Sequence, residues 1–407
     1  MDAIRVTRRP AGGSVLAVRA SPAGALSRQR PAIALAAAPR DQRALIVSSF
    51  VLPHTGGIEQ FVDAASVLLS QRGWSVRILA CRPRRGPAAA DVTLPSRFLP
   101  PGGWPVPVRG WRTLWEEVGR ADVVVSNGAR QLLPNVAAVA ARLRRRKVVF
   151  VLHGSGAPFT TSSFLYHRLL GSIFEWLVVR PVLRLTRPVS LSRAGVEGAR
   201  RRYGVNAAHV PYPVRDLPPA TPRSLGPDEP IRIAWVGRLY REKNPLQAVA
   251  VVERLRRRRD ASLHVYGSGV LADEVARLAL DRPWLHIHGR RSWNEIQAAQ
   301  DEAHVCLSTS LRDATQIAML EPLSRGIPVV STQVGDAPYH YVDPRLQSFC
   351  VDPADTDAAA SAILELASAY GAYREAFAAN ASRLRLRHAR GAERLSELLE
   401  AAAGRET

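Results

Sequence analysis

The sequence predicts an α/β protein with two domains, each built on a largely parallel sheet. Short apolar runs of strand length alternate with longer segments of helical period, which is the pattern of successive βαβ units. A chain of 407 residues exceeds what one hydrophobic core usually serves, and a hydrophobic content of 46% is enough for two cores. Residues 216–229 are rich in proline and lack an apolar period. We therefore expect this stretch to link the two domains.

The linker and the two ends of the chain divide the sequence into five expected segments. These are a disordered, arginine-rich extension (residues 1–40), an N-terminal domain (41–215), the linker (216–229), a C-terminal domain (230–380) and a final helix (381–407). The extension carries seven arginines, one acid and no sustained period, so we expect it to be disordered. Its composition is also typical of a transit peptide, but the whole chain shares this composition, so that indication is weak.

The chain is strongly basic, with a formal net charge of +21. Nearly all of this charge comes from arginine, since Lys147 and Lys243 are the only lysines. This imbalance, together with the many alanines, is typical of coding bias rather than of a surface that binds nucleic acid. No recognised nucleic-acid-binding module is present in the sequence. A basic surface can still attract an anionic membrane or steer a phosphorylated substrate, and both alternatives stay open.

No apolar run in the sequence has the length and purity of a membrane span. The best candidate, residues 173–185, is interrupted by Glu175, Arg180 and Arg184. Three cysteines lie far apart without metal-ligand spacing, and we interpret them as reduced core residues: Cys81, Cys306 and Cys350. These features predict a cytoplasmic protein, with peripheral association at the inner face of the membrane left open.

Two stretches of the N-terminal domain are harder to assign. Residues 94–120 are rich in proline and tryptophan and are predicted to form a loop that leads into a short helix. Residues 164–187 are apolar with dispersed arginines. They form either a pair of core helices broken at Pro181 or an amphipathic surface that docks on a membrane. We favour the core interpretation, because apolar helix stripes in a domain of this size usually face a core.

Two features of the N-terminal domain point to a ligand. A first strand, residues 44–49, leads through a loop to Gly56, Gly57 and a helix from Ile58. Such a glycine pair either lets backbone N–H groups approach an anion or forms a turn that needs positive φ. His153 follows a predicted strand, residues 147–152, and precedes a glycine. It either faces a cleft or is a loop histidine bonded to backbone. The residues alone decide neither alternative.

In the C-terminal domain, a predicted strand (residues 231–236) is followed by a loop (237–245) and a helix. Arg238 and Lys243 flank this loop, where a phosphate would lie on the helix N-terminus. Because the chain otherwise uses arginine, a lysine at position 243 indicates that a compact point charge is needed there. The other lysine, Lys147, follows three arginines and is predicted to belong to a solvated basic patch.

Residues 308–332 lie between two short apolar runs of strand length and contain a helical period that ends before Gly326. Asp313 falls in the loop before this helix, and Glu321 follows it by eight residues. Ligands of open α/β sheets bind outside the carboxyl ends of the strands, so an acid in that loop points to a ligand. From spacing alone we favour the simpler interpretation, in which the helix dipole stabilises Asp313 and Glu321 is solvated.

Several of these motifs together resemble the retaining nucleotide-sugar glycosyltransferases of family 4. They are GGIE at 56–59, VGRLYREKNP at 236–245, VYGSG at 265–269, and an acid eight residues before Glu321 in LEPLSRGIPVVST. This resemblance spans about residues 41–400 and implies the GT-B fold, in which two Rossmann-like domains face each other across a cleft. In that fold the C-terminal domain holds the nucleotide-sugar and the N-terminal domain holds most of the acceptor. The last helix then crosses back to the N-terminal domain.

The resemblance implies how the donor's diphosphate is held. Arg238 and Lys243 would bind the diphosphate and balance its charge as the sugar leaves. Gly57, with Gly56 before it, would approach the phosphates as the cleft closes. Each charge-assisted hydrogen bond of this kind contributes about 1.5–3 kcal/mol. The implied chemistry requires no cofactor and no metal.

The resemblance also implies how the sugar is held and what is made. Glu321 would accept hydrogen bonds from the ribose, whereas Asp313 and His153 would contact the transferred sugar. The implied reaction moves a hexose-type sugar from a nucleoside-diphosphate sugar to a cell-envelope, lipid-linked or natural-product acceptor. It retains the configuration at the anomeric carbon.

Three departures from the family pattern bear on the substrates. Asp313 stands where glutamate is usual, ATQI at 314–317 replaces the usual glycines, and residues 210–213 read VPYP where Pro-Asn-Gly is common. An inactive sugar-nucleotide or polyanion-binding protein of the same fold is therefore the alternative. A nicotinamide-dependent dehydrogenase does not fit, because the loop at 50–57 lacks G-x-G-x-x-G.

Overall fold

The computed structural model describes residues 42–52, 56–84, 86–99, 104–154, 165–214, 217–221 and 223–403. Residues Arg40–Thr407 form one compact unit, which is described below. The extension predicted for residues 1–40 lies outside the described residues. Among the described residues all three cysteines are buried and free.

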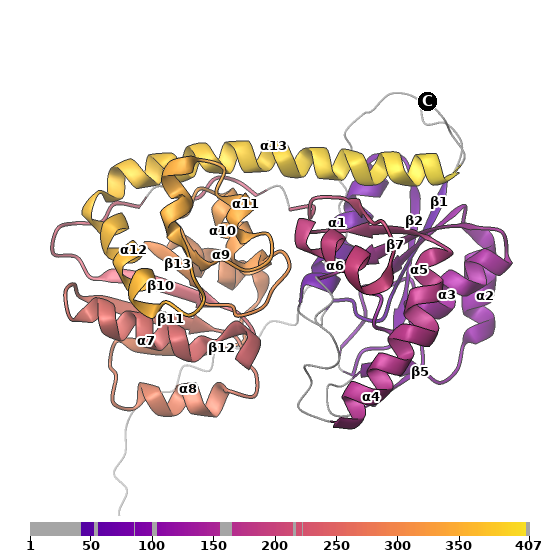
Figure 1. Cartoon of the computed structure of the whole chain (residues 1–407), viewed down its shortest axis with the longest axis horizontal. Coiled ribbons are helices and arrows are strands. Elements are labelled where there is room, and N and C mark those ends of the chain that lie inside the picture. The colour runs from indigo at the N-terminus through magenta and orange to yellow at the C-terminus, as the bar shows by residue number, and fades with distance from the viewer. Residues whose placement is uncertain are drawn as a thin grey trace, which may run out of the picture. The chain divides into compact units, whose positions relative to one another are not determined.

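The first sheet has seven parallel strands in the order β3-β2-β1-β6-β7-β8-β9 (Figure 1). Its strands are β1 (Arg43–Ser48), β2 (Ser75–Cys81), β3 (Val92–Leu94), β6 (Val123–Asn127), β7 (Lys147–Leu152), β8 (Arg187–Ser190) and β9 (Ala208–His209). Its helices are α1 (Gly57–Gln71), α2 (Trp111–Arg120), α3 (Leu132–Leu143), α4 (Leu165–Phe174), η2 (Glu175–Val179), α5 (Arg180–Arg184) and α6 (Arg193–Tyr203). Alternate residues of β1 enter different cores, with Ile46 in one and Leu45 in the other. The sheet is therefore buried on both faces, which explains its continuous apolar strands.

The second sheet has six parallel strands in the order β12-β11-β10-β13-β14-β15. Its strands are β10 (Ile231–Val236), β11 (Ala261–Tyr266), β12 (Leu285–Gly289), β13 (Val305–Ser308), β14 (Val329–Thr332) and β15 (Cys350–Val351). The helices that follow them are η3 (Arg241–Lys243), α7 (Pro245–Arg256), α8 (Ala272–Ala279), α9 (Trp293–Asp301), α10 (Ile317–Ser324), α11 (Ala337–His340), η4 (Pro344–Phe349), α12 (Thr356–Ser368) and α13 (Tyr370–Ala403). The prediction of two α/β domains with parallel sheets is confirmed.

Both sheets reverse their strand order at one point, and this reversal locates the candidate site. The chain runs from β1 outward to β2 and β3 and then returns to the other side of β1 at β6. It repeats this path from β10 to β12 and then to β13. At such a switch point the loops diverge and leave a crevice at the carboxyl ends of the strands. The loops after β1, β6, β10 and β13 are therefore the candidate ligand-binding loops.

The structure corrects the interpretation of residues 94–120. We expected a loop before the helix, but β4 (Ser96–Leu99) and β5 (Trp104–Pro107) form an antiparallel hairpin. Pro105 and Pro107 belong to β5. Proline is tolerated there because a strand of a two-stranded hairpin has one edge that needs no N–H donors. The prolines therefore led us to predict a loop where β5 is a strand.

The structure also corrects the expected break at Pro181. The segment α4–η2–α5 is helical without interruption from 165 to 184. The turn before the proline is a π-turn, in which the Arg180 N–H donates to the carbonyl oxygen of Glu175. Proline supplies no N–H of its own, and local widening of the helix is one way to accommodate it. The core interpretation holds for one face, where Val179, Val182 and Leu183 are buried.

The final helix, α13, packs against both α10 and α1 and against β6 and β7 (Figure 1). A buried His388 on this helix hydrogen-bonds through Nδ1 to the carbonyl oxygen of Tyr212. Next to it, a Cβ on Gly391 would lie 2.6 Å from the carbonyl oxygen of Pro211. The helix therefore needs a small residue where it passes residues 210–213.

Two buried histidines predict a loss of stability in acid. The rings of His340 and His388 lie 6.0 Å apart. Burial lowers the pKa of His340 to about 3 and that of His388 to about 4. Below pH 6.5 the unfolded chain therefore binds protons that the folded chain does not, and each group reduces stability by about 1.4 kcal/mol per pH unit. We expect the Tm to be flat above pH 7 and to fall steeply between pH 6 and pH 4.

A His388→Gln variant tests this prediction by slope rather than by absolute stability. Thermal unfolding between pH 4.5 and pH 8 should show a shallower acid limb than in the wild type. The matched control is His286→Gln, because His286 is exposed. Equal acid slopes in the wild type and the His388 variant would contradict the assignment.

Candidate functional site

The loops after β10 and β11 pack backbone against backbone. Gly267, which follows β11, has φ +148, and a Cβ there would lie 1.8 Å from the carbonyl oxygen of Gly237. A hydrogen bond of 3.0 Å also joins the Leu239 N–H to the carbonyl oxygen of Ser268. No side chain fits at position 267, which explains the first of the two glycines in VYGSG.

The loop after β13 fixes the loop that carries Lys243. The Thr309 hydroxyl accepts a hydrogen bond from the Trp235 indole N–H at 3.0 Å and donates to the carbonyl oxygen of Asn244 at 2.8 Å. The Leu311 N–H donates to the carbonyl oxygen of Glu242 at 2.9 Å. Two loops about 70 residues apart in sequence are thus held as one surface at the switch point.

On this surface Lys243 and Asp313 form an ion pair between the Lys243 Nζ and the Asp313 Oδ2. Their side chains are 21% and 19% exposed, so the pair is accessible from solvent. Arg238 belongs to the same loop, is exposed, and lies with its guanidinium 5.3 Å from the ring centre of Tyr240. Lys243 is therefore paired with Asp313. Arg238 lies over the ring of Tyr240.

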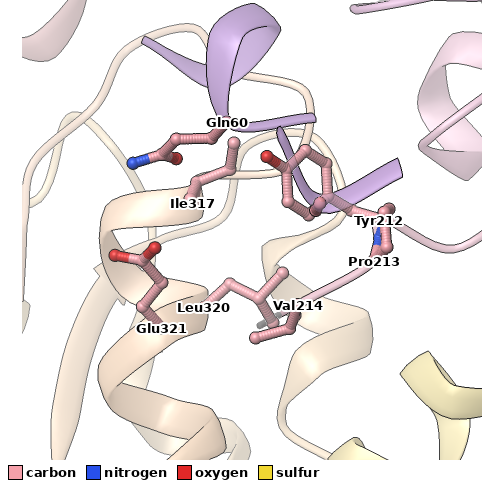
Figure 2. Close-up of a pocket in the computed structure, with 8 residues that line it drawn as sticks. Gln60, Tyr212, Pro213, Val214, Ile317, Leu320 and Glu321 are labelled. Atoms are coloured by element: carbon pink, nitrogen blue, oxygen red, sulfur yellow. The ribbon is translucent and has the colours of Figure 1, made fainter. Parts of the chain in front are cut away.

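Glu321 is buried on α10 rather than solvated, which contradicts the simpler interpretation of that residue. Its carboxylate accepts a hydrogen bond of 3.4 Å from the indole N–H of Trp293. A small pocket opens beside it and is lined by α1, by residues 212–214 and by α10 (Figure 2). Figure 2 shows Glu321 and Gln60 on the same side of Ile317. A buried carboxylate at a pocket wall is suited to accepting hydrogen bonds from a polyol.

His153 follows β7 and, in the part of the chain that the structure describes, its ring is held by the side chain of Asn127. Asn127, at the end of β6, donates from Nδ2 to the Ser48 hydroxyl at 3.2 Å and to the Ile58 carbonyl at 3.4 Å. Its Oδ1 therefore faces the His153 Nε2, which must carry the proton. Burial lowers the pKa of His153 to about 3, so the ring is neutral. Its Nδ1 is then a hydrogen-bond acceptor.

The glycine pair does not form a turn with positive φ. Gly56 is extended, with φ 177, and Gly57 is the first residue of α1. A Cβ on Gly57 would lie 2.7 Å from the Ile317 Cδ1, so the start of α1 approaches the start of α10 closely. The Tyr212 hydroxyl donates to the Gly57 carbonyl at 3.3 Å. A side chain at position 57 would therefore require the end of the Ile317 side chain to move.

Both domains of the chain match families of known glycosyltransferases. Residues 230–369 match the family described as "Glycosyl transferases group 1", and residues 55–217 match "Glycosyltransferase Family 4". Together the two matches cover most of the chain. The chain belongs to this glycosyltransferase family. The resemblance to family 4 glycosyltransferases is therefore confirmed, while retention of configuration stays a prediction.

Relatives of known structure have the same fold. Sucrose-phosphate synthase from Thermosynechococcus elongatus superposes with a TM-score of 0.64 at 16% identity, over 88% of this chain and 98% of that chain. HepE from Anabaena, solved in complex with UDP and glucose, superposes with a TM-score of 0.66 at 14% identity, over 88% and 100% of the two chains. The glycosyltransferase described here therefore has the GT-B fold.

A relative in sequence is one of the subunits of human phosphatidylinositol N-acetylglucosaminyltransferase. It is 24% identical over 346 residues, which are 80% of this chain and 69% of the relative. In the described part of the glycosyltransferase no helix is long and apolar enough to cross a membrane. Nor do its described residues include a group of three or more His, Cys, Asp or Glu that could hold a metal ion.

Two residues of the glycosyltransferase's site escaped the sequence interpretation. In the sequence, Asn127 is only a polar residue at the end of an apolar run and was not singled out. Gln316 stands where the family's glycines are usual, has φ 47 and is buried. Its side-chain amide accepts from the Ser308 hydroxyl at 2.9 Å and donates to the Thr332 carbonyl at 3.0 Å. Gln316 therefore ties the loops after β13 and β14 together, which offsets the strain of a left-handed conformation.

The contact between Gly57 and Ile317 makes a testable prediction. Gly57→Ala should displace the tip of the Ile317 side chain and destabilise the glycosyltransferase by about 1 kcal/mol, at the low end for overpacking because that tip is flexible. The same change made in an Ile317→Ala background should cost less, because the atom in conflict is then absent. Thermal unfolding measures both effects.

Gly371→Ala is the matched control, since a Cβ there meets nothing within 4 Å. It should leave the Tm unchanged or raise it slightly, because alanine favours a helix. A Gly57→Ala variant as stable as the Gly371→Ala control would show that α1 and α10 are not in close contact.

Proposed function

We propose that this glycosyltransferase moves a hexose-type sugar from a nucleoside-diphosphate sugar to a cell-envelope, lipid-linked or natural-product acceptor, with retention at the anomeric carbon. The observation that carries the proposal is the ion pair of Lys243 and Asp313 at the switch point of the second sheet. It joins a phosphate-binding cation and a sugar-binding carboxylate on one accessible surface.

In the proposed complex the diphosphate replaces Asp313 as the partner of Lys243. A point charge on a flexible stem can change partner without rearranging the loop that carries it. Arg238, which is exposed over Tyr240, supplies the second cation. As the bond between sugar and phosphate breaks, negative charge grows on the leaving diphosphate, and these two cations stabilise it. The proposed chemistry needs no metal and no cofactor.

Once Lys243 has turned to the phosphate, Asp313 is available to accept hydrogen bonds from the sugar hydroxyls. The neutral His153 offers Nδ1 to the same sugar from the first sheet, while the buried Glu321 accepts from the ribose. Gly57 and Gly56, at the N-terminus of α1, bring backbone N–H groups toward the phosphates. We propose that the acceptor hydroxyl attacks from the face that the diphosphate leaves, which retains the configuration.

The printed names of the relatives guide the choice of substrates. HepE binds UDP and glucose, so a uridine nucleotide is the first donor to test. The human relative is named for phosphatidylinositol, so a lipid acceptor is the first acceptor to test. We propose a cytoplasmic location for this reaction, since the three cysteines are free and buried as in proteins of a reducing compartment.

An inactive sugar-nucleotide or polyanion-binding protein is the second candidate. The pairing of Lys243 with Asp313 supports it, because this pairing neutralises the cation and occupies the carboxylate in the absence of a ligand.

A product assay separates the two candidates. The full chain is incubated with UDP-, GDP-, ADP- and dTDP-sugars, with and without phosphatidylinositol vesicles, and released nucleoside diphosphate is measured. We expect one donor to be consumed, and NMR of the product from an α-linked donor to show an α-linkage. A β-linked product would refute retention. Binding of a donor without any turnover would favour the inactive protein.

A further inference from the structure

The helical segment α4–η2 carries an apolar face that the core does not use. Five large apolar side chains on it are between 43% and 66% exposed: Leu169, Leu170, Ile173, Trp176 and Leu177. Their spacing follows one side of a helix, at steps of three, four and seven residues. Single exposed leucines are ordinary, but a contiguous stripe of this kind marks an interaction surface. We call these five residues the α4–η2 face.

The opposite side of the same segment is anchored firmly in the first domain. Glu175 is buried and accepts hydrogen bonds from the Arg130 Nε at 3.1 Å and the Arg202 Nε at 2.8 Å. Val179 and Leu183 are buried one and two turns further on. The segment is therefore held by its inner side, and the exposure of the α4–η2 face is not the result of a helix that has failed to pack.

Positive charge lies beyond the C-terminal end of this face. Between residues 165 and 187 the single acid is Glu175, which is buried and paired. Arg184 and Arg187 are exposed, and the guanidinium of Arg184 lies near Gly204 at the end of α6. There α6 adds Arg200 and Arg201, which share one carboxylate, Glu197.

We propose that the α4–η2 face docks on an anionic lipid bilayer, with its leucines and Trp176 in the interfacial region and the neighbouring arginines on lipid phosphates. An apolar stripe bordered by cations fits this occupant, because apolar burial and electrostatic attraction to anionic lipids both favour interfacial helices. Tryptophan suits such a position, since its ring is apolar and its N–H finds a partner among the headgroups. A second copy of the chain is the other occupant, and the oligomeric state of the variants distinguishes it from a bilayer.

This docking does not require the proposed transfer reaction, so binding is tested without turnover. The full chain is floated with vesicles of phosphatidylcholine alone and with about 30% phosphatidylglycerol. We expect binding to the anionic vesicles that weakens when salt is raised from about 0.1 M to about 0.5 M. Trp176→Ser/Leu177→Ser should reduce the partition coefficient by about 10-fold or more, since it removes two of the five apolar side chains. Arg184→Glu/Arg187→Glu should weaken binding to the anionic vesicles by about 10-fold or more and leave binding to neutral vesicles unchanged.

The matched control is Trp111→Ser/Leu143→Ser, which removes an exposed tryptophan and leucine from α2 and α3. It should bind vesicles like the wild type. Both serine variants should stay folded, with Tm values lowered by a few degrees at most, because the four side chains are 37–70% exposed. The proposal is overturned if the wild type does not float with anionic vesicles, or if both serine variants lose binding equally. It is also overturned if the wild type is a dimer that Trp176→Ser/Leu177→Ser dissociates, which would assign the face to a second copy.

Discussion

Replacing Lys243 with alanine should lower kcat/KM for donor turnover by about 100-fold and weaken nucleoside-diphosphate binding by about 10-fold or more. The residue is the cation of the ion pair at the switch point, and it is the partner that we assign to the diphosphate. Its loss removes a charge-assisted hydrogen bond that strengthens as the leaving group gains charge. Calorimetry with the nucleotide and a nucleotide-release assay measure the two effects separately.

Lys147→Ala is the matched control, because Lys147 is the other lysine of the chain and is exposed at the start of β7. The same chemical change there should leave both quantities near the wild-type values. If the two alanine variants bind nucleotide equally well, the diphosphate is not held by Lys243.

Asp313→Asn should separate donor turnover from nucleotide binding. We expect turnover to fall by about 100-fold, since the amide is a poorer acceptor for sugar hydroxyls in the transition state. Affinity for the bare nucleoside diphosphate should instead stay equal or rise by about 3- to 10-fold. The reason is that Lys243 loses the carboxylate that competes with the phosphates for its charge.

Asp281→Asn serves as the control, because Asp281 is exposed and lies after α8, away from the loops of the switch point. Nucleotide binding and turnover that fall together by the same factor in Asp313→Asn would argue that Asp313 holds the loop rather than the sugar.

The sheet strands could be predicted from the sequence because each is a short apolar run buried on both faces. β7 and β10 begin and end where the runs do, and Gly326 ends α10 with φ +85 as a C-terminal glycine should. The predictions that were wrong concern features that depend on contacts between distant segments, which a local sequence pattern does not contain. The pairing of β4 with β5 depends on two segments finding each other, and the proline content of β5 concealed it.

The candidate site was predictable in its positions but not in its contacts. Lys243 and Asp313 were each singled out, yet their pairing joins residues 70 positions apart and could not be derived from spacing. The burial of Glu321 depends on what packs over α10, so the helical period alone suggested a solvated side chain. Gln316 stood out only as part of a departure from the family pattern and Asn127 did not stand out, because their importance comes from hydrogen bonds to other loops.

The apolar segment 164–187 shows a third kind of limit. Its composition fitted both a core helix and a docking surface, and the structure assigns one role to each side of the same helix. The π-turn at Glu175–Val179 contributes to this division, because it shifts the register of side chains along the helix. A sequence analysis that assumes 3.6 residues per turn along the whole helix cannot show such a shift.

The most direct test of the donor site is a thermal-shift titration of the wild-type chain with UDP, GDP, ADP and dTDP. A ligand at about 100 times its Kd stabilises a protein by about 2.7 kcal/mol, which is a rise in Tm of roughly 5–10 °C for a domain of about 150–250 residues and about 3 °C if the whole chain unfolds as one unit. We predict that one of the four nucleotides, UDP first, produces such a rise. No rise with any of the four would contradict a nucleoside-diphosphate site at the carboxyl ends of β10 and β13.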